Sequence, residues 1–246
     1  MPPTPHPPVP FELTALRRRA TPLRVGLLHV PVAGGGPGPL AELVRQRRAV
    51  ALDLLLLSHA VWPLSSPDPI VAPSTLWARA LGVDARPGIR ATISRSWSWL
   101  EHRRLVSTAR ASRARAITIL CEDGSGRPWQ HPVEEKEPFF QLPHAYWESG
   151  LHTDLGLAGK AVLLIGLSLQ HEAPYFELPL DRGSRWYGLS ERTVRLGLRE
   201  LRAVKLLRTW VERRPSANSP TGYAFDRRHS LNSLNAFARR RQRSEL

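Results

Sequence analysis

Four arginines recur at close spacing in the last third of the chain: Arg192, Arg195, Arg199 and Arg202. Steps of three and four residues place them on one side of an α-helix. A guanidinium group is always charged and carries five N–H donors in a planar fork, which suits paired hydrogen bonds to a phosphate or to the O6/N7 edge of guanine. The chemistry that this face can do is therefore recognition of an anion or a base edge.

The helix that must position these arginines has its own local signals. Ser190 can cap it by accepting a backbone N–H bond from the first turn, and Glu191 suits the positive end of the helix dipole. An apolar stripe with a spacing of i, i+4 and i+7 runs along a different side and comprises Val194, Leu198 and Leu201. One side of this helix can pack while the arginine side stays free to meet a ligand.

The flanking segments predict a small motif around this helix. A shorter helix is expected over Leu180–Tyr187, with Gly188 making a tight turn between the two helices. Two strands are expected after the arginine helix, over Leu206–Val211 and Tyr223–Phe225. The Pro-, Asn- and Ser-rich tip between them spans Arg213–Thr221.

This order of elements resembles the winged helix-turn-helix family. The resemblance covers about a quarter of the chain, and the residues that carry it are Trp186, Tyr187, Gly188, Leu189, Ser190, Thr193, Val194, Leu198, Leu201 and Leu207. It implies binding to double-stranded DNA, with the arginine helix in the major groove and the tip as the wing. A helical hairpin in an unrelated all-α protein would show the stripe, but not the strand-loop-strand that follows.

The same order of elements is expected once before, in the first half of the chain. Helices are predicted over 40–62, from Ser74 as cap to Gly82, and over 88–103, followed by a hairpin. A shift of 101 residues aligns the two stripes, with Ile93, Trp97, Leu100 and Leu105 falling on Val194, Leu198, Leu201 and Leu206. We therefore expect a mainly α fold with small β-hairpins (α+β) that contains two tandem winged helix-turn-helix domains.

The expected domain organisation follows from this repeat. A flexible segment with a strand at Leu23–Val30 is expected over 1–39, the first domain over 40–121, a polar linker over 122–138 and the second domain over 139–229. Ser230 is predicted to cap a basic C-terminal helix or tail over 230–246, whose arginines either contact a DNA backbone or complement the helix dipole.

The two predicted recognition helices differ in charge. The first has Ala91, Ser94, Ser98 and Glu101 where the second has its four arginines, so direct base readout is assigned to the second. The predicted contacts there are Arg192, Thr193, Arg195, Arg199, Arg202, Arg213 and Arg214. In the first domain they are Arg86, Arg90, Arg95, Arg110, Arg113 and Arg115.

Charge distribution favours a polyanionic partner. The formal net charge is +14, divided into +10 over 1–121, −6 over 122–180 and +10 over 181–246. Two basic blocks around an acidic middle suit two contacts on a duplex, with the acidic part facing away. The preference for arginine over lysine can reflect the base composition of the genome. The separation of basic from acidic residues along the chain cannot.

Other classes of function lack their signatures. Cys121 is the single cysteine, which excludes an intrachain disulfide and fits a reducing cytoplasm. No signal peptide, membrane span, phosphate loop, metal-ligand pair or serine elbow is recognisable, so we expect neither enzyme activity, cofactor nor metal.

The predicted function is sequence-specific binding of double-stranded DNA by a cytoplasmic, nucleoid-associated transcription regulator. A plasmid or mobile-element replication initiator, which binds repeated origin sites, is the alternative that the tandem arrangement resembles. A winged-helix adaptor for protein contacts is the third reading. Besides DNA, the expected partners are a second copy of the chain or replication or transcription proteins.

Overall fold

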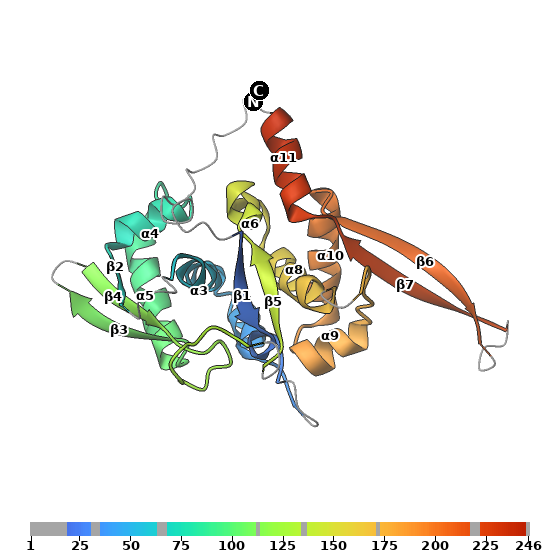
Figure 1. Cartoon of the computed structure of the whole chain (residues 1–246), viewed down its shortest axis with the longest axis horizontal. Helices are drawn as coiled ribbons and strands as arrows, with labels where there is room; N and C mark the ends of the chain where they lie inside the picture. Colours follow the sequence, from blue (N-terminus) through green and yellow to red (C-terminus); the bar gives the residue numbers. More distant parts are fainter. Residues whose placement is uncertain are drawn as a thin grey trace.

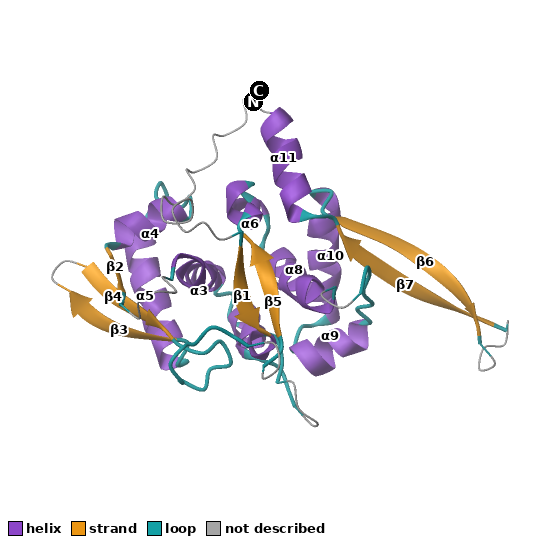
Figure 2. Ribbon diagram, viewed as in Figure 1, coloured by secondary structure: helices purple, strands orange, loops and turns teal. Residues whose placement is uncertain are grey.

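The chain folds into an α+β structure in which helices alternate with small antiparallel sheets (Figures 1 and 2). The computed structural model describes residues 19–30, 35–62, 68–111, 114–133, 137–170, 173–216 and 222–244. The α+β class expected from the sequence is confirmed. Among the described residues, no helix is both long enough and apolar enough to cross a membrane.

The described residues of the first half of the chain form nine elements. In chain order they are β1 (Ala20–Arg24), the 3-10 helix η1 (Val25–Leu27), α2 (Pro39–Arg45), α3 (Ala49–Val61), β2 (Ile70–Ala72), α4 (Ser74–Ala80), α5 (Ile89–His102), β3 (Val106–Ala111) and β4 (Ala114–Ile119). The sheet of this half has the strand order β2-β4-β3, and all its pairings are antiparallel.

Nine elements are also formed by the part of the second half that the structure describes. They are β5 (Phe139–Pro143), α6 (Ala145–Glu148), α7 (Leu151–Asp154), α8 (Leu157–Leu169), α9 (Leu180–Tyr187), α10 (Glu191–Ala203), β6 (Leu207–Pro215), β7 (Tyr223–Leu231) and α11 (Leu234–Ser244). Strands β6 and β7 form a long antiparallel hairpin that projects from the body of the molecule (Figure 1).

Two parts of the chain repeat one order of elements; we call residues 49–119 the first module and residues 157–231 the second. Each begins with a buried helix, α3 or α8, and continues through two helices into a hairpin. Each also has a short segment that pairs with the second hairpin strand. This is β2 on β4 in the first module and a bridge from Phe176 to His229 in the second.

The junction after the third helix of each module has the same backbone geometry. Arg104 and Lys205 both adopt a left-handed φ, of 54° and 59°. The residue after each of them donates its backbone N–H to the carbonyl oxygen five residues earlier. These bonds run from Leu105 to Leu100 at 3.0 Å and from Leu206 to Leu201 at 2.9 Å, a pattern that ends a helix. The stripe residues aligned by the 101-residue shift are all buried: Ile93, Trp97, Leu100, Leu105, Val194, Leu198, Leu201 and Leu206.

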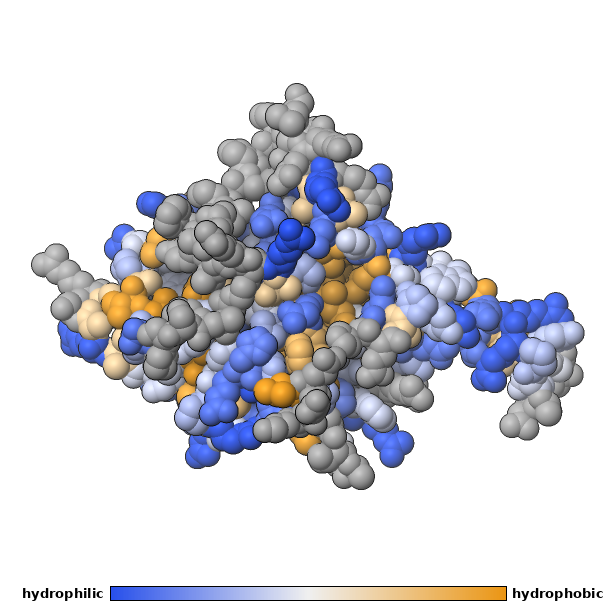
Figure 3. All heavy atoms as spheres, viewed as in Figure 1, coloured by the Kyte–Doolittle hydropathy of each residue, from blue (hydrophilic) through white to orange (hydrophobic). Residues whose placement is uncertain are grey.

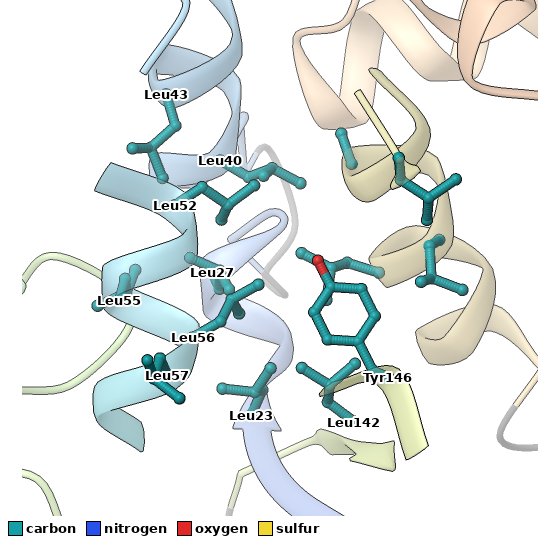
Figure 4. Close-up of a cluster of buried hydrophobic side chains, with 14 of the residues drawn as sticks. Leu23, Leu27, Leu40, Leu43, Leu52, Leu55, Leu56, Leu57, Leu142 and Tyr146 are labelled. Carbon is teal, nitrogen blue, oxygen red and sulfur yellow. The ribbon is translucent and has the colours of Figure 1, made fainter. Parts of the chain in front are cut away.

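A two-stranded sheet of β1 and β5 lies between the modules (Figure 1). Its register places Leu23 opposite Phe140, and both side chains are fully buried. Leucines of α2 and α3 meet Leu142 and Tyr146 beside this sheet (Figure 4). One hydrophobic cluster therefore extends through both modules, and its burial resists their separation.

The prediction of a flexible segment over 1–39 is wrong for residues 20–30. Residues 20–24 form β1, which is held in place by five register pairs with β5. The strand expected over Leu23–Val30 starts earlier and ends at Arg24, because the chain then turns into η1. Residues 1–18 lie outside the described part of the chain.

In the polar linker expected over 122–138, Glu122 and Glu137 contact Arg24 of β1. Glu122 is fully buried, forms an ion pair with Arg24 at 3.0 Å and accepts the indole N–H of Trp129 at 3.3 Å. Glu137 also pairs with Arg24. Two acidic residues of this segment thus neutralise the buried guanidinium of Arg24. The composition of the segment does not reveal this role.

Three local expectations are also corrected. The long helix expected over 40–62 is two helices, because Arg47 has a left-handed φ of 55° that ends α2. Ser74 is the first residue of α4, and no side chain caps this helix. Ser230 lies in β7; Ser233 takes the capping position instead, accepting a backbone N–H from three residues later at 3.4 Å.

Candidate nucleic-acid interface

Helix α10 starts and packs as its local signals predict. The Ser190 hydroxyl caps it by accepting the backbone N–H of Thr193 at 3.2 Å. Its apolar stripe is buried, and Gly197 lets the helix lie directly against α8: a Cβ at this position would meet the carbonyl oxygen of Ala158 and would lie 2.5 Å from a methyl group of Val162. This close packing fixes which side of α10 faces solvent.

The four arginines of α10 are all exposed on that outer side. Arg195 is 3.4 Å from the carboxylate of Glu191, one turn earlier, and Arg202 donates from Nε to the carbonyl oxygen of Leu198 at 3.2 Å. Exposed pairs of this kind are weak, so they leave the guanidinium groups free to exchange partners. Within the described part of the chain, no ion pair engages Arg192 or Arg199.

Between α10 and β7 lies a groove of about 1020 Å³, which we call the α10–β7 groove. Five arginines line it: Arg192, Arg195, Arg199, Arg202 and Arg227. Its three acidic side chains are Glu177, Glu191 and Asp226. The lining therefore carries an excess of positive charge. One wall is the helix and the other is the inner face of the hairpin, and the excess of positive charge suits an anionic ligand.

The hairpin side of the groove contributes an aromatic side chain and a buried histidine to the lining. Phe225 lines the groove and is 67% exposed, although it is a large apolar side chain. His229 is buried and hydrogen-bonded to Thr209 at 3.0 Å. Its burial, and then the neighbouring charges of Arg227 and Arg202, lower the pKa of His229 to about 4. The imidazole is therefore neutral near pH 7.

The outer part of the hairpin is basic and largely hydrophilic (Figure 3). Arg213 and Arg214, which were expected in the loop at the tip, lie in β6, because its pairing with β7 extends to Pro215. Arg213 stacks on the ring of Tyr223 at 3.4 Å, and Arg214 pairs with Asp226. Arg214 is therefore partly neutralised within the hairpin, while Arg213 is held flat on an exposed ring.

Thr193 and Glu101 have structural uses. The hydroxyl of Thr193, an expected contact, lies 2.9 Å from the Ser190 hydroxyl and belongs to the cap of α10. Glu101 accepts both the backbone N–H and the hydroxyl of Thr108 at 2.9 Å, so it fixes the start of β3. Both side chains thus hold local structure, and a ligand contact by Thr193 stays a prediction.

The basic residues expected in the first module are more dispersed. Arg86 lies in the turn before α5, Arg90 and Arg95 lie on α5, and all three are exposed. Arg110 and Arg115 are direct cross-strand partners in β3 and β4. Like charges placed opposite each other destabilise a hairpin, and an anion bound between them would offset this cost. Arg113 lies outside the described residues.

Sequence reasoning missed the part of the groove lining that β7 supplies, which includes Phe225 and Arg227. Phe225 and Arg227 line the groove together because alternate residues of β7 share one face. The alternation in YAFDRRHSL was a usable signal, but the strand was expected to end at Phe225. In the basic C-terminal helix α11, Arg241 pairs with Asp154, which ties this helix to the body of the molecule.

The described residues contain no group of three or more His, Cys, Asp or Glu side chains that could hold a metal ion. Burial raises the pKa of the Cys121 thiol, which disfavours the nucleophilic thiolate. The chain matches no protein-family model, and no curated protein or solved structure was found to be similar to it.

Proposed function

We propose that this protein binds double-stranded DNA in a sequence-specific manner, with α10 in the major groove and the β6–β7 hairpin against the adjacent backbone. The observation that carries the proposal is the α10–β7 groove, in which five arginines line a concave surface between a helix and a hairpin. Helix–turn–helix–hairpin order in both modules supports two tandem winged helix-turn-helix units.

The dimensions of α10 fit this role. Its 13 residues make a helix about 20 Å long, and a B-DNA major groove about 12 Å wide admits an α-helix. Arg192, Arg195 and Arg199 project from the exposed side, where bidentate pairing with guanine is available. The first module contributes charge without a comparable set of donors on α5, so we assign it to backbone contacts.

The test separates specific readout from simple charge. Arg195→Ala combined with Arg199→Ala removes two groove arginines, and Arg45→Ala combined with Arg127→Ala removes the same charge outside the groove. Duplexes selected from a random pool by the wild-type chain are then compared with scrambled duplexes at fixed salt. We expect the groove variant to lose about 1–3 kcal/mol of discrimination for each base contact removed, and the control to keep its preference.

Equal preference in both variants would refute the assignment of readout to α10. Absence of duplex binding by the wild-type chain at physiological salt would refute the proposal itself, and would favour a winged-helix adaptor that contacts other proteins.

For the biological process we propose a transcription regulator, which acts in the cytoplasm on nucleoid DNA. Replication initiation is the second candidate. One observation favours it: two unlike modules in one chain share a hydrophobic core, so a single molecule presents an asymmetric surface. Such a surface suits direct repeats, as in an origin, whereas a two-fold symmetric homodimer suits an inverted repeat. The arrangement of the selected sites next to the gene distinguishes the two processes.

A further inference from the structure

A second, smaller basic pocket lies in the first module, where the N-terminal end of α3 meets α5. Its volume is about 270 Å³, and its polar lining comprises Arg47, Arg48, Thr92, Arg95 and Ser96. No acidic side chain lines it. It lies in the module that lacks the arginine-rich helix, so the α10–β7 groove does not account for it.

Two side-chain groups in this pocket lack hydrogen-bond partners in the described part of the chain, while Arg95 donates to the Thr92 hydroxyl at 3.4 Å. Ser96 is only 5% exposed, and no described residue hydrogen-bonds to its hydroxyl. The Nε atom of Arg48 is buried without a partner. Helix α3 has neither a capping side chain nor an acid in its first turn, so its free N–H groups and its dipole add positive potential. A buried Arg48 Nε without an acceptor, an unpaired Ser96 hydroxyl and an uncapped helix start together suit an anion in this pocket.

The second module shows how the equivalent position is satisfied. There, Glu200 of α10 accepts the backbone N–H groups of Gly156 and Gly159 at the start of α8, at 2.9 and 3.0 Å. The 101-residue shift that aligns the modules places Trp99 at the position of Glu200. Its indole donates to Gln46 at 2.8 Å and cannot accept in place of the carboxylate. At this helix end the first module therefore has arginines where the second module has a carboxylate.

We propose that this pocket binds a phosphate group, held by Arg48, Arg95, the Ser96 hydroxyl and the first turn of α3. Guanidinium groups, a hydroxyl and helix-terminal N–H groups are the donors that proteins combine around phosphate. The phosphate comes either from a DNA backbone, in which case the inference rests on the proposed function, or from a free phosphate-bearing molecule. In both cases the recognised group is the same.

The first arm of the test uses inorganic phosphate and the full chain. Binding is followed by phosphorus NMR at constant ionic strength for the wild type, Arg48→Ala, Ser96→Ala and the control Arg45→Ala. Arg45 is exposed on the neighbouring helix α2 and does not line the pocket. We expect affinity to fall about tenfold in Arg48→Ala and about threefold in Ser96→Ala, which removes only one hydroxyl. The control keeps the wild-type affinity.

The second arm identifies the source of the phosphate by measuring how duplex affinity depends on salt. A backbone contact makes the slope of log affinity against log salt shallower by about one unit in Arg48→Ala, but not in Ser96→Ala, which removes no charge. If Arg48→Ala loses phosphate binding but keeps the wild-type salt slope for duplex binding, the ligand is a free phosphate-bearing molecule.

The inference is overturned if Arg48→Ala and Ser96→Ala match Arg45→Ala in both arms. A wild-type chain that binds no duplex refutes the proposed function, while the phosphate arm still decides the pocket.

Discussion

Lys160 of α8 donates hydrogen bonds to both carboxylate oxygens of Asp53 of α3, at 2.6 and 2.7 Å, across the boundary between the two modules. The side chains are 5% and 13% exposed, so the pair is largely removed from water. Removing one partner leaves a buried charge without compensation, and we expect Lys160→Met to lower the free energy of unfolding by about 3–5 kcal/mol. Urea denaturation measures this change.

The double variant Asp53→Asn with Lys160→Met removes both charges and should be more stable than Lys160→Met alone. Lys205→Met, at an exposed position, is the control for loss of one lysine. If Lys160→Met is no less stable than this control, the pair does not hold the modules together.

Gly197→Ala tests the contact between α10 and α8. The added Cβ would meet the carbonyl oxygen of Ala158, which is backbone and cannot move aside on its own. We expect a loss of about 1–3 kcal/mol of unfolding free energy through overpacking, measured by thermal or denaturant unfolding. Gly36→Ala is the matched control, because a Cβ there meets nothing within 4 Å. Equal stability of the two variants would contradict the close approach.

His229 predicts a dependence of stability on pH. Burial, and then Arg227 and Arg202, lower its pKa from 6.5 to about 4. The unfolded chain therefore takes up a proton near pH 6.5 that the folded chain takes up only near pH 4. The stabilisation is present above pH 6.5, and it is lost as the pH falls through this interval. Unfolding free energies of the wild type and His229→Gln, measured from pH 7 to pH 4, should diverge, with the variant showing the weaker dependence. Parallel curves would argue against a buried neutral imidazole.

Arg227 tests the hairpin wall of the groove. We expect Arg227→Ala to weaken binding to all duplexes and to make the salt slope shallower by about one unit, since one phosphate contact is lost. Arg208 lies on the opposite face of the same hairpin by strand parity and is also exposed, so Arg208→Ala is the control. A shallower slope in the control alone would mean that the outer face, not the groove, meets the duplex.

Sequence reasoning was most accurate where the signals are local. The helix expected over Leu180–Tyr187 has those bounds in the structure, and α10 begins after the expected cap Ser190. Capping, helix periodicity and a glycine turn with φ of 61° at Gly188 all act within a few residues, so they are readable in one dimension. The buried stripes of both modules followed from the same periodicity.

What could not be predicted depends on partners far away in the chain. Pairing of β1 with β5 needs contacts between Leu23 and Phe140, and neither segment shows locally which strand it will meet. The burial of Glu122 depends on Arg24 in the same way. In the candidate site, the arginines of α10 were found, but Phe225 and Arg227 were missed because hairpin length depends on pairing across the sheet.

The position of β1 has a consequence for synthesis of the chain. A ribosome releases Leu23 well before Phe140 exists, so this strand emerges with an open edge and with its one leucine not yet covered by β5. The β1–β5 sheet cannot form until β5 has emerged, so the hydrophobic cluster around β1 stays incomplete until then. The nascent chain thus passes through an interval in which it is vulnerable to aggregation, and an isolated fragment ending at residue 121 would stay in that condition permanently.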